Sequence, residues 1–175
     1  KAARRALEGA GIAPEDVQLV IVATSTAENP FPSTASVLQD RLGCRGAAFD
    51  LSAACSGWVY ALVTAAQFIS TGAVQTALVV GAETMSRVLD WSDRSTCILF
   101  GDGAGAAVLG PVAPGGGVLG FDLGSDGSGG PLLTLENEPA TRPDAPARSR
   151  GHITQNGREV YRFAVNVMGE SVLRA

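Results

Sequence analysis

The segment that most constrains the fold is residues 17–23, which read VQLVIVA and are nearly all apolar. A strand of this composition is expected to be covered on both faces, as in parallel sheets whose connecting helices lie on each side. Helical patterns follow at residues 34–42 and from about 55 to 70. Three further apolar strands are expected, at residues 47–51, 77–81 and 104–109. This alternation predicts an α/β layered domain.

The chain changes character near residue 112, where glycine and proline become frequent. We place a domain boundary there, between residues 1–112 and 113–175. Short strands are expected at 118–123 and 132–135, joined by loops. Residues 156–173 have apolar side chains at helical spacing and start with Asn156 and Glu159, which resemble a capping box. The sequence therefore predicts a last helix that faces the core.

Composition excludes several classes of protein. Of 175 residues, 46% are apolar and only 17% are charged, which rules out a disordered chain. The net charge of −4 argues against a general nucleic-acid binder. No apolar run is long enough for a membrane helix. The chain starts at Lys1 and stops at Ala175 inside helical patterns and shows no signal peptide, so we expect an internal fragment of a longer protein.

Three cysteines, Cys44, Cys55 and Cys97, are too few and too widely spaced for a disulfide framework or a zinc site. Cys44 and Cys97 are expected to be buried. Cys55 follows a predicted strand and the small residues 52–54, and Gly57 comes directly after it, as in a nucleophile elbow. A helix N-terminus at this point would favour the thiolate, and its amides would stabilise an oxyanion on a bound thioester. From these residues alone, a buried structural thiol remains an alternative.

Other motifs are weaker. The segment GDGAG at residues 101–105 lacks the spacing of a dinucleotide fingerprint and the Lys-Ser or Lys-Thr of a P-loop. No Gly-x-Ser-x-Gly motif is present, so a serine hydrolase is not supported. His152 is the only histidine and lies beside an arginine-rich loop, where we expect no catalytic role.

Four blocks in order closely resemble the β-ketoacyl-acyl carrier protein synthase III family of thiolase-like condensing enzymes. They are DLSAACSG from Asp50, GAVQTALVVGAETMSR from Gly72, DRSTCILFGDGAGAAVL from Asp93 and NGREVYRFAV from Asn156. The resemblance implies a layered α/β/α/β/α fold built from two related halves. Residues 1–112 would then be most of the N-terminal half, and residues 113–175 the linker, the loop region and the first helix of the C-terminal half.

The resemblance also implies roles for particular residues. Cys55 matches the cysteine that accepts the acyl group from a short acyl-CoA, with acetyl-CoA expected. Phe31 matches an aromatic residue that reaches across the dimer interface into the partner's acyl pocket, and Phe100 lies where the family lines that pocket. Arg94 matches an arginine at the adenine end of CoA. Gly157 and Tyr161 match positions along the pantetheine tunnel. Arg162 matches a basic residue that meets the acidic acyl carrier protein. Tyr161 departs mildly, because the family more often has Phe there.

The resemblance implies acyl-CoA and malonyl-acyl carrier protein as substrates. It also implies a homodimer in the cytoplasm that uses no cofactor or metal and binds neither nucleic acid nor membrane. The family also needs a His and an Asn from its C-terminal half, and neither motif is present here, so this chain alone is not expected to condense. Two alternatives stay open. One is a relative from specialised metabolism that loads another starter or only transfers acyl groups. The other is a non-catalytic α/β binding module.

Overall fold

The computed structural model describes residues 1–137 and 150–175. These residues divide into two compact units. The first contains residues 1–83 and 103–121, and the second contains residues 84–102 and 122–175.

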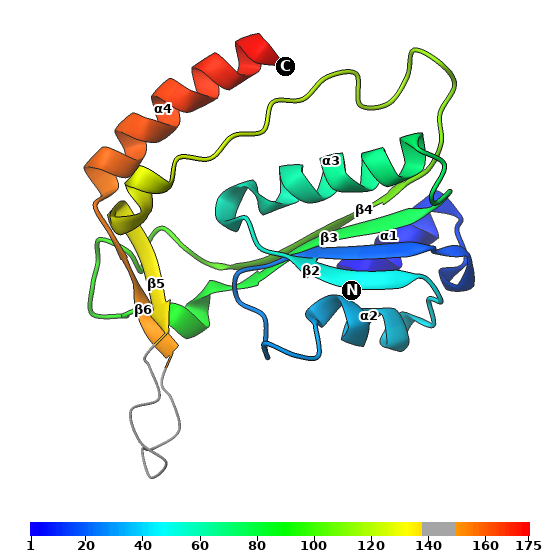
Figure 1. The fold of residues 1–175 in the computed structure, drawn as a ribbon. Coiled ribbons are helices and arrows are strands. Elements are labelled where there is room, and N and C mark those ends of the chain that lie inside the picture. Colours follow the sequence, from blue (N-terminus) through cyan, green and yellow to red (C-terminus); the bar gives the residue numbers. More distant parts are fainter. Residues whose placement is uncertain (138–149) are drawn as a thin grey trace. The chain divides into compact units, whose positions relative to one another are not determined.

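The first unit is built on a four-stranded sheet with the strand order β2-β1-β3-β4 (Figure 1). The strands are β1 (Leu19–Ala23), β2 (Ala47–Leu51), β3 (Ala77–Thr84) and β4 (Asp102–Leu109). Strand β1 pairs in parallel with both β2 and β3, so that Ile21 lies opposite Phe49 on one side and Val79 on the other. The four predicted strands are therefore confirmed, with β3 and β4 longer than predicted.

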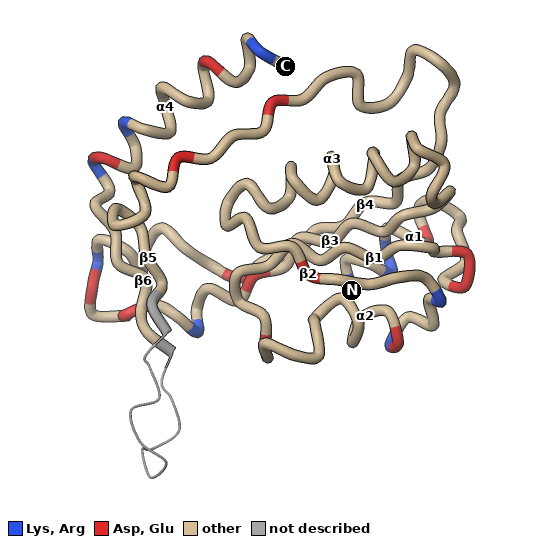
Figure 2. The backbone as a smooth tube through the Cα atoms, in the orientation of Figure 1, with Lys and Arg blue, Asp and Glu red and all other residues tan. Residues whose placement is uncertain are grey.

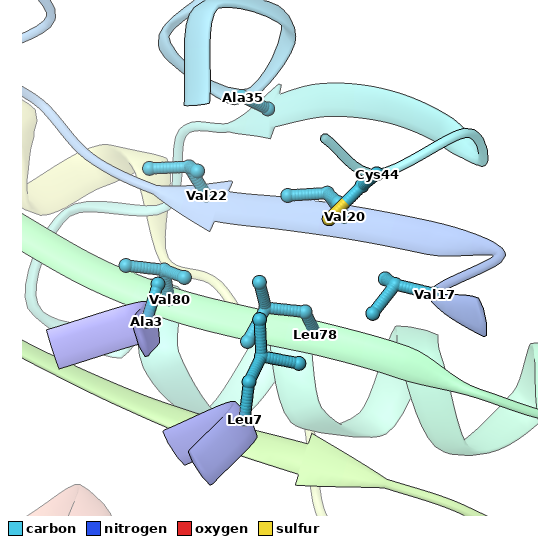
Figure 3. Packing of buried hydrophobic residues seen from close by; sticks show 9 residues of the cluster. All are labelled: Ala3, Leu7, Val17, Val20, Val22, Ala35, Cys44, Leu78 and Val80. Atoms are coloured by element: carbon cyan, nitrogen blue, oxygen red, sulfur yellow. The ribbon is translucent and has the colours of Figure 1, made fainter. Parts of the chain in front are cut away.

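Helices cover both faces of this sheet, as the apolar strands predict. Helices α1 (Ala2–Ala10) and α2 (Thr34–Leu42) pack on one face, where Val20 and Val22 of β1 meet Leu7 and Ala35 (Figure 3). Helix α3 (Gly57–Ser70) packs on the other face. All five residues of β1 are buried, because alternate side chains enter opposite cores.

Helix α3 approaches the sheet through small residues. Ala61 and Ala65 are fully buried against the sheet, and the helix carries no charged residue along its length (Figure 2). Val59 lies at helical spacing from Leu62 and Ile69, which predicts a shared buried face, but its side chain is 48% exposed. The prediction is wrong at Val59 because the alanines make the close contact with the sheet.

The second unit contains the antiparallel hairpin β5 (Leu133–Asn137) and β6 (Arg150–Gln155), in which Leu135 lies opposite Ile153. A small core forms where Ile153 packs with Val88 and Leu89. Helix α4 (Gly157–Arg174) follows β6, and the Asn156 side chain accepts a hydrogen bond from the Glu159 amide, as expected of its capping residue.

Two predictions fail in the later part of the chain. Residues 118–123 form no strand, and Leu119 is 79% exposed, because the described residues offer this segment no neighbouring strand. The apolar stripe of α4 does not face a core, since none of its described side chains is buried and Leu173 is 89% exposed. No described helix is both long and apolar enough to cross a membrane.

Candidate active site

Cys55 lies in a sharp turn between a strand and a helix. Strand β2 ends at Leu51, and a single 3₁₀ turn at Ala54–Ser56 leads into α3 at Gly57. The thiol-bearing side chain is exposed in this turn. Ligands of parallel α/β sheets bind beyond the carboxyl ends of the strands, and Cys55 follows such an end. The structure therefore places the Cys55 thiol where a ligand could reach it.

The turn has a strained backbone. Ala54 has a φ of 44°, and it is the one residue other than glycine with a positive φ among the residues that the structure describes. Such a conformation costs about 1–3 kcal/mol and persists only where the surroundings impose it. Here the Ser56 amide donates to the Ala53 carbonyl at 3.1 Å, and the Gly57 amide donates to the Ala54 carbonyl. These bonds close the turn immediately around Cys55.

The same bonds change the expectation for an oxyanion site. The sequence predicts that role for the free amides at the start of the helix. The amides of Ser56 and Gly57 are already donating within the turn, so they are not available to a ligand. The amide of Cys55 itself lies next to the atom where acylation would occur, so it is a candidate donor to an oxyanion there.

Close packing fixes the beginning of α3, and hence Cys55, against the sheet. A side-chain carbon added at Gly57 would lie 3.3 Å from the Ala23 Cβ at the end of β1. One added at Gly81 of β3 would lie 3.3 Å from the Trp58 ring. Both distances are tighter than ordinary van der Waals contact, so glycine at these positions allows the first turn of α3 to approach the strands.

Phe31 lies in the loop between β1 and α2, also in the first unit. Its ring is 83% exposed and packs in neither core of that unit. The loop ends at Ser33, whose side chain accepts a hydrogen bond from the Ser36 amide at 3.1 Å and caps α2. An aromatic ring held this far into solvent gains nothing from hydrophobic burial within the described chain.

Arg94 and Phe100 belong to the second unit. Two aspartate turns follow each other here: Asp90 accepts from the Ser92 amide and Asp93 accepts from the Ser95 amide, each at 2.9 Å. Arg94 lies within the second turn and is exposed. Phe100 is half-buried and packs against the small core around Ile153.

The remaining predicted site residues lie on α4. Gly157 is its first residue, and Tyr161 is 72% exposed. Arg162 is exposed and forms an ion pair with Glu159 at 3.4 Å, one turn earlier on the helix. A pair in this setting is worth little, about 0.3–0.5 kcal/mol, so the guanidinium remains accessible to a partner.

The three cysteines have different environments. Cys44 is buried in the core shared with Val20, and burial followed by the Glu15 charge raises the pKa of its thiol. This confirms its predicted burial. Cys97, also predicted to be buried, is half-buried. Cys55 is therefore the most accessible thiol of the chain.

Two carboxylates near the turn were missed by the sequence analysis. Asp50 lies within β2, and Glu83 lies within β3. Glu83 accepts a hydrogen bond from the segment that connects β1 to α2, and Asp50 accepts hydrogen bonds from the first two residues of α2. The signal that could have found them is an acidic residue inside an otherwise apolar strand, because a half-buried carboxylate needs hydrogen-bond donors.

Comparison with known proteins agrees with this geometry. A family model described as 3-oxoacyl-[acyl-carrier-protein (ACP)] synthase III matches residues 49–127, which include Cys55 and its turn. The β-ketoacyl-[acyl-carrier-protein] synthase III of Desulfitobacterium hafniense is 54% identical over 179 residues, covering 100% of this chain and 54% of that protein. Over its whole length this chain is similar to β-ketoacyl-acyl carrier protein synthase III.

Solved structures place the synthase III-like chain in the same fold. The crystal structure of 3-oxoacyl-[acyl-carrier-protein] synthase III from Aquifex aeolicus matches with a TM-score of 0.85 and 41% identity, covering 96% of this chain and 51% of that one. A priming β-ketosynthase from a polyketide biosynthetic pathway matches with a TM-score of 0.81 and 39% identity, over 94% of this chain and 49% of that one. The predicted thiolase-like α/β fold is thereby confirmed. The chain spans about half the length of these relatives.

The synthase III-like chain holds no candidate metal site in residues 1–137 and 150–175, since no three His, Cys, Asp or Glu side chains converge there. His152, the only histidine, is exposed in β6.

Proposed function

We propose that the protein containing this chain is an acyltransferase that starts fatty-acid synthesis by taking the acyl group of a short acyl-CoA onto Cys55. The observation that carries the proposal is the exposed Cys55 thiol, held in a strained turn after β2 and before α3. Similarity to named synthase III enzymes over the whole chain supports the same chemistry.

In the first step, the Cys55 sulfur attacks the thioester carbonyl carbon of the acyl-CoA. A bond between this sulfur and the acyl carbon forms, and the bond between the acyl carbon and the CoA sulfur breaks. CoA leaves as its thiolate and takes up the proton that the cysteine gave up, so the step needs no oxidant, reductant or cofactor. The amide of Cys55 is the chain's own donor to the tetrahedral oxyanion.

In the second step, malonyl-acyl carrier protein loses CO₂, and the resulting carbanion attacks the acyl carbon on Cys55. A carbon–carbon bond forms while the bond to the Cys55 sulfur breaks, which frees the thiolate for another cycle. A His and an Asn in the remainder of the full-length protein would assist this step. The present chain contains neither motif of that kind, so condensation is assigned to the whole protein.

Other residues take supporting roles in this proposal. The exposed ring of Phe31 would enter the acyl pocket of a second copy in a homodimer, and Phe100 would line the pocket. Arg94 would contact the adenine end of CoA. The pantetheine arm would pass Gly157 and Tyr161 on α4. The accessible guanidinium of Arg162 would meet the acidic acyl carrier protein.

The proposal also covers the organisation of the whole protein. Residues 1–112 would form most of its N-terminal half, and residues 113–175 would begin its C-terminal half. A cytoplasmic location suits an enzyme that draws on acyl-CoA and a carrier protein.

The test uses the full-length protein and acetyl-CoA labelled in its acetyl group. We expect stable label on one peptide containing Cys55, a mass increase of one acetyl group, and no label in a Cys55→Ala variant. A Cys44→Ala variant is the matched control and should label normally, because Cys44 is buried away from the turn. Label that persists in Cys55→Ala would contradict the assignment.

A second candidate is a starter-loading enzyme of specialised metabolism. It is favoured by the similarity to a priming β-ketosynthase of a polyketide pathway. The two candidates differ in the acyl group preferred and in whether condensation follows. Acylation rates with a series of straight and branched acyl-CoAs, followed by addition of malonyl-acyl carrier protein, separate them.

A further inference from the structure

The loop that carries Phe31 is held at both ends by carboxylates from the strands that flank β1. It leaves β1 after Ala23 and enters α2 at Thr34. Asp50 of β2 holds its end, and Glu83 of β3 holds its beginning. Phe31 lies between these two points and is itself exposed.

At the end of the loop, the Asp50 carboxylate adds to the Ser33 cap of α2. Its two oxygens accept hydrogen bonds from the Thr34 amide at 2.8 Å and the Ala35 amide at 2.7 Å. The first amides of a helix have no partners within the helix and carry its positive dipole, so a carboxylate there is stabilising. Because Asp50 lies one residue before the end of β2, the contact joins α2 to the strand that leads to Cys55.

At the beginning of the loop, the Glu83 carboxylate accepts three hydrogen bonds. The Ser25 amide donates to it at 2.8 Å, the Thr26 hydroxyl at 2.5 Å and the Thr24 hydroxyl at 3.5 Å. Thr24 and Thr26 are buried, so this network is protected from water. The Thr24 amide also donates to the Leu51 carbonyl at 3.2 Å, which fixes the start of the loop to the end of β2.

The contacts of Asp50 with α2 and of the Thr24 amide with Leu51 both attach the loop to the end of β2. Leu51, the last residue of β2, lies four positions before Cys55, and Asp50 is its neighbour. The loop would keep its connection to the strands without these bonds, but its conformation between Thr24 and Thr34 would be free to vary. Bonds to charged acceptors are the strong ones, and they also fix direction.

We propose that Asp50 and Glu83 are positioning residues that fix the Phe31 loop on the strands that lead to the Cys55 turn, and that they thereby determine which acyl chains a second copy accepts. This inference rests on the proposed function, in which Phe31 enters the acyl pocket of that second copy. It assigns to these two carboxylates the role of holding a specificity residue in place. Neither carboxylate takes part in the chemistry.

The test compares three variants of the full-length protein. Asp50→Asn keeps the size of the side chain but leaves one amide facing an NH₂ group. Thr26→Val removes a hydroxyl donor to Glu83 and leaves that carboxylate in place. Asp126→Asn is the matched control, because Asp126 likewise accepts from an amide and a hydroxyl, those of Ser128, but in a turn of the second unit.

Two measurements are made on each variant. Hydrogen exchange of residues 24–35 reports the loop, and the ratio of kcat/KM for acetyl-CoA to that for longer acyl-CoAs reports selection. We expect Asp50→Asn and Thr26→Val to increase exchange in the loop and to change the ratio by about tenfold, since small displacements near a reacting centre cost up to about 100-fold in rate. Asp126→Asn should change neither quantity.

The outcomes separate this inference from the proposed function. Faster exchange with an unchanged ratio would overturn the role in selection, and unchanged exchange would overturn the positioning itself. If Asp50→Asn does not fold, Thr26→Val carries the test, because it removes one donor and no carboxylate. If the unmodified protein does not acylate Cys55, the proposed function fails first, and exchange in the loop still tests the positioning.

Discussion

The carboxylate of Asp50 accepts a hydrogen bond from the amide of Ala35 at 2.7 Å, so that β2 and α2 are joined by a bond outside the sheet ladder. The two residues are 15 positions apart in the sequence. Asp50 lies in β2, the strand that leads to the Cys55 turn. Ala35 lies in α2, the helix that follows the Phe31 loop. Two segments of the candidate site, which the sequence analysis treated as separate motifs, are therefore parts of one hydrogen-bonded assembly.

Thiol reactivity should follow exposure. With iodoacetamide at neutral pH, we expect rapid modification of Cys55 and almost none of Cys44, because Cys44 is buried and its pKa is raised by that burial. Peptide mapping at short times measures both rates in one sample. Modification of Cys55 no faster than that of an unstructured thiol peptide would support the non-catalytic alternative.

Removing the exposed aromatic ring should affect selectivity and association more than stability. Phe31 is 83% exposed, so Phe31→Ala should change the free energy of unfolding by no more than about 0.5 kcal/mol. We expect an altered preference for acyl-chain length or weaker dimerisation, measured by kcat/KM ratios and by sedimentation. If preference and dimerisation are both unchanged, the placement of Phe31 at an acyl pocket is wrong.

The close approach of β3 and α3 at Gly81 should not tolerate a side chain. In Gly81→Ala the new methyl group would lie 3.3 Å from the Trp58 ring, which has to move. We expect a loss of about 1–3 kcal/mol in the free energy of unfolding and slower acylation of Cys55, because Trp58 lies in the first turn of α3.

Gly9→Ala is the matched control for that substitution. Gly9 lies within α1 and has open space around it, so alanine there should stabilise the protein by about 0.5–1 kcal/mol. Denaturation by urea measures both variants. Equal effects of the two substitutions would contradict the packing argument.

Asp102 should make stability depend on pH in the acid range. The Ser86 amide at 2.8 Å and the Ser86 hydroxyl at 2.7 Å hold the pKa of its carboxyl below the usual range. The folded protein therefore binds this proton less readily than the unfolded chain does. The resulting stabilisation is fully present above the unfolded pKa of about 3.9, and it is lost as the pH falls through the lower folded value.

The Asp102→Asn variant lacks the charged carboxyl, so comparing it with the unmodified protein measures this contribution to stability. The difference in the free energy of unfolding between the unmodified protein and the variant should shrink as the pH is lowered through the acid range. A carboxyl NMR titration of Asp102 should give a pKa below that of a model peptide. A difference that stays constant with pH would show that the Ser86 contacts do not favour the charged form.

Local patterns in the sequence were sufficient to predict the strands of the first unit and the helices that connect them. An apolar run such as Leu19–Ala23 has no stable place except a strand covered on both faces, and Ser33 marks the beginning of α2 because its side chain satisfies a helix amide. The position of Cys55 between a strand and a helix also follows from composition and spacing.

Only the tertiary structure decided which element packs against each apolar face of a helix or strand. Periodicity identifies an apolar face but not its neighbour, which is why Ala61 rather than Val59 meets the sheet and why the stripe of α4 is exposed. Residues 118–123 have strand-like composition but lack a partner strand among the described residues. The bond from Ala35 to Asp50 depends on two strands lying side by side, and hydrogen bonds between distant segments are set by the folded backbone rather than by local propensity.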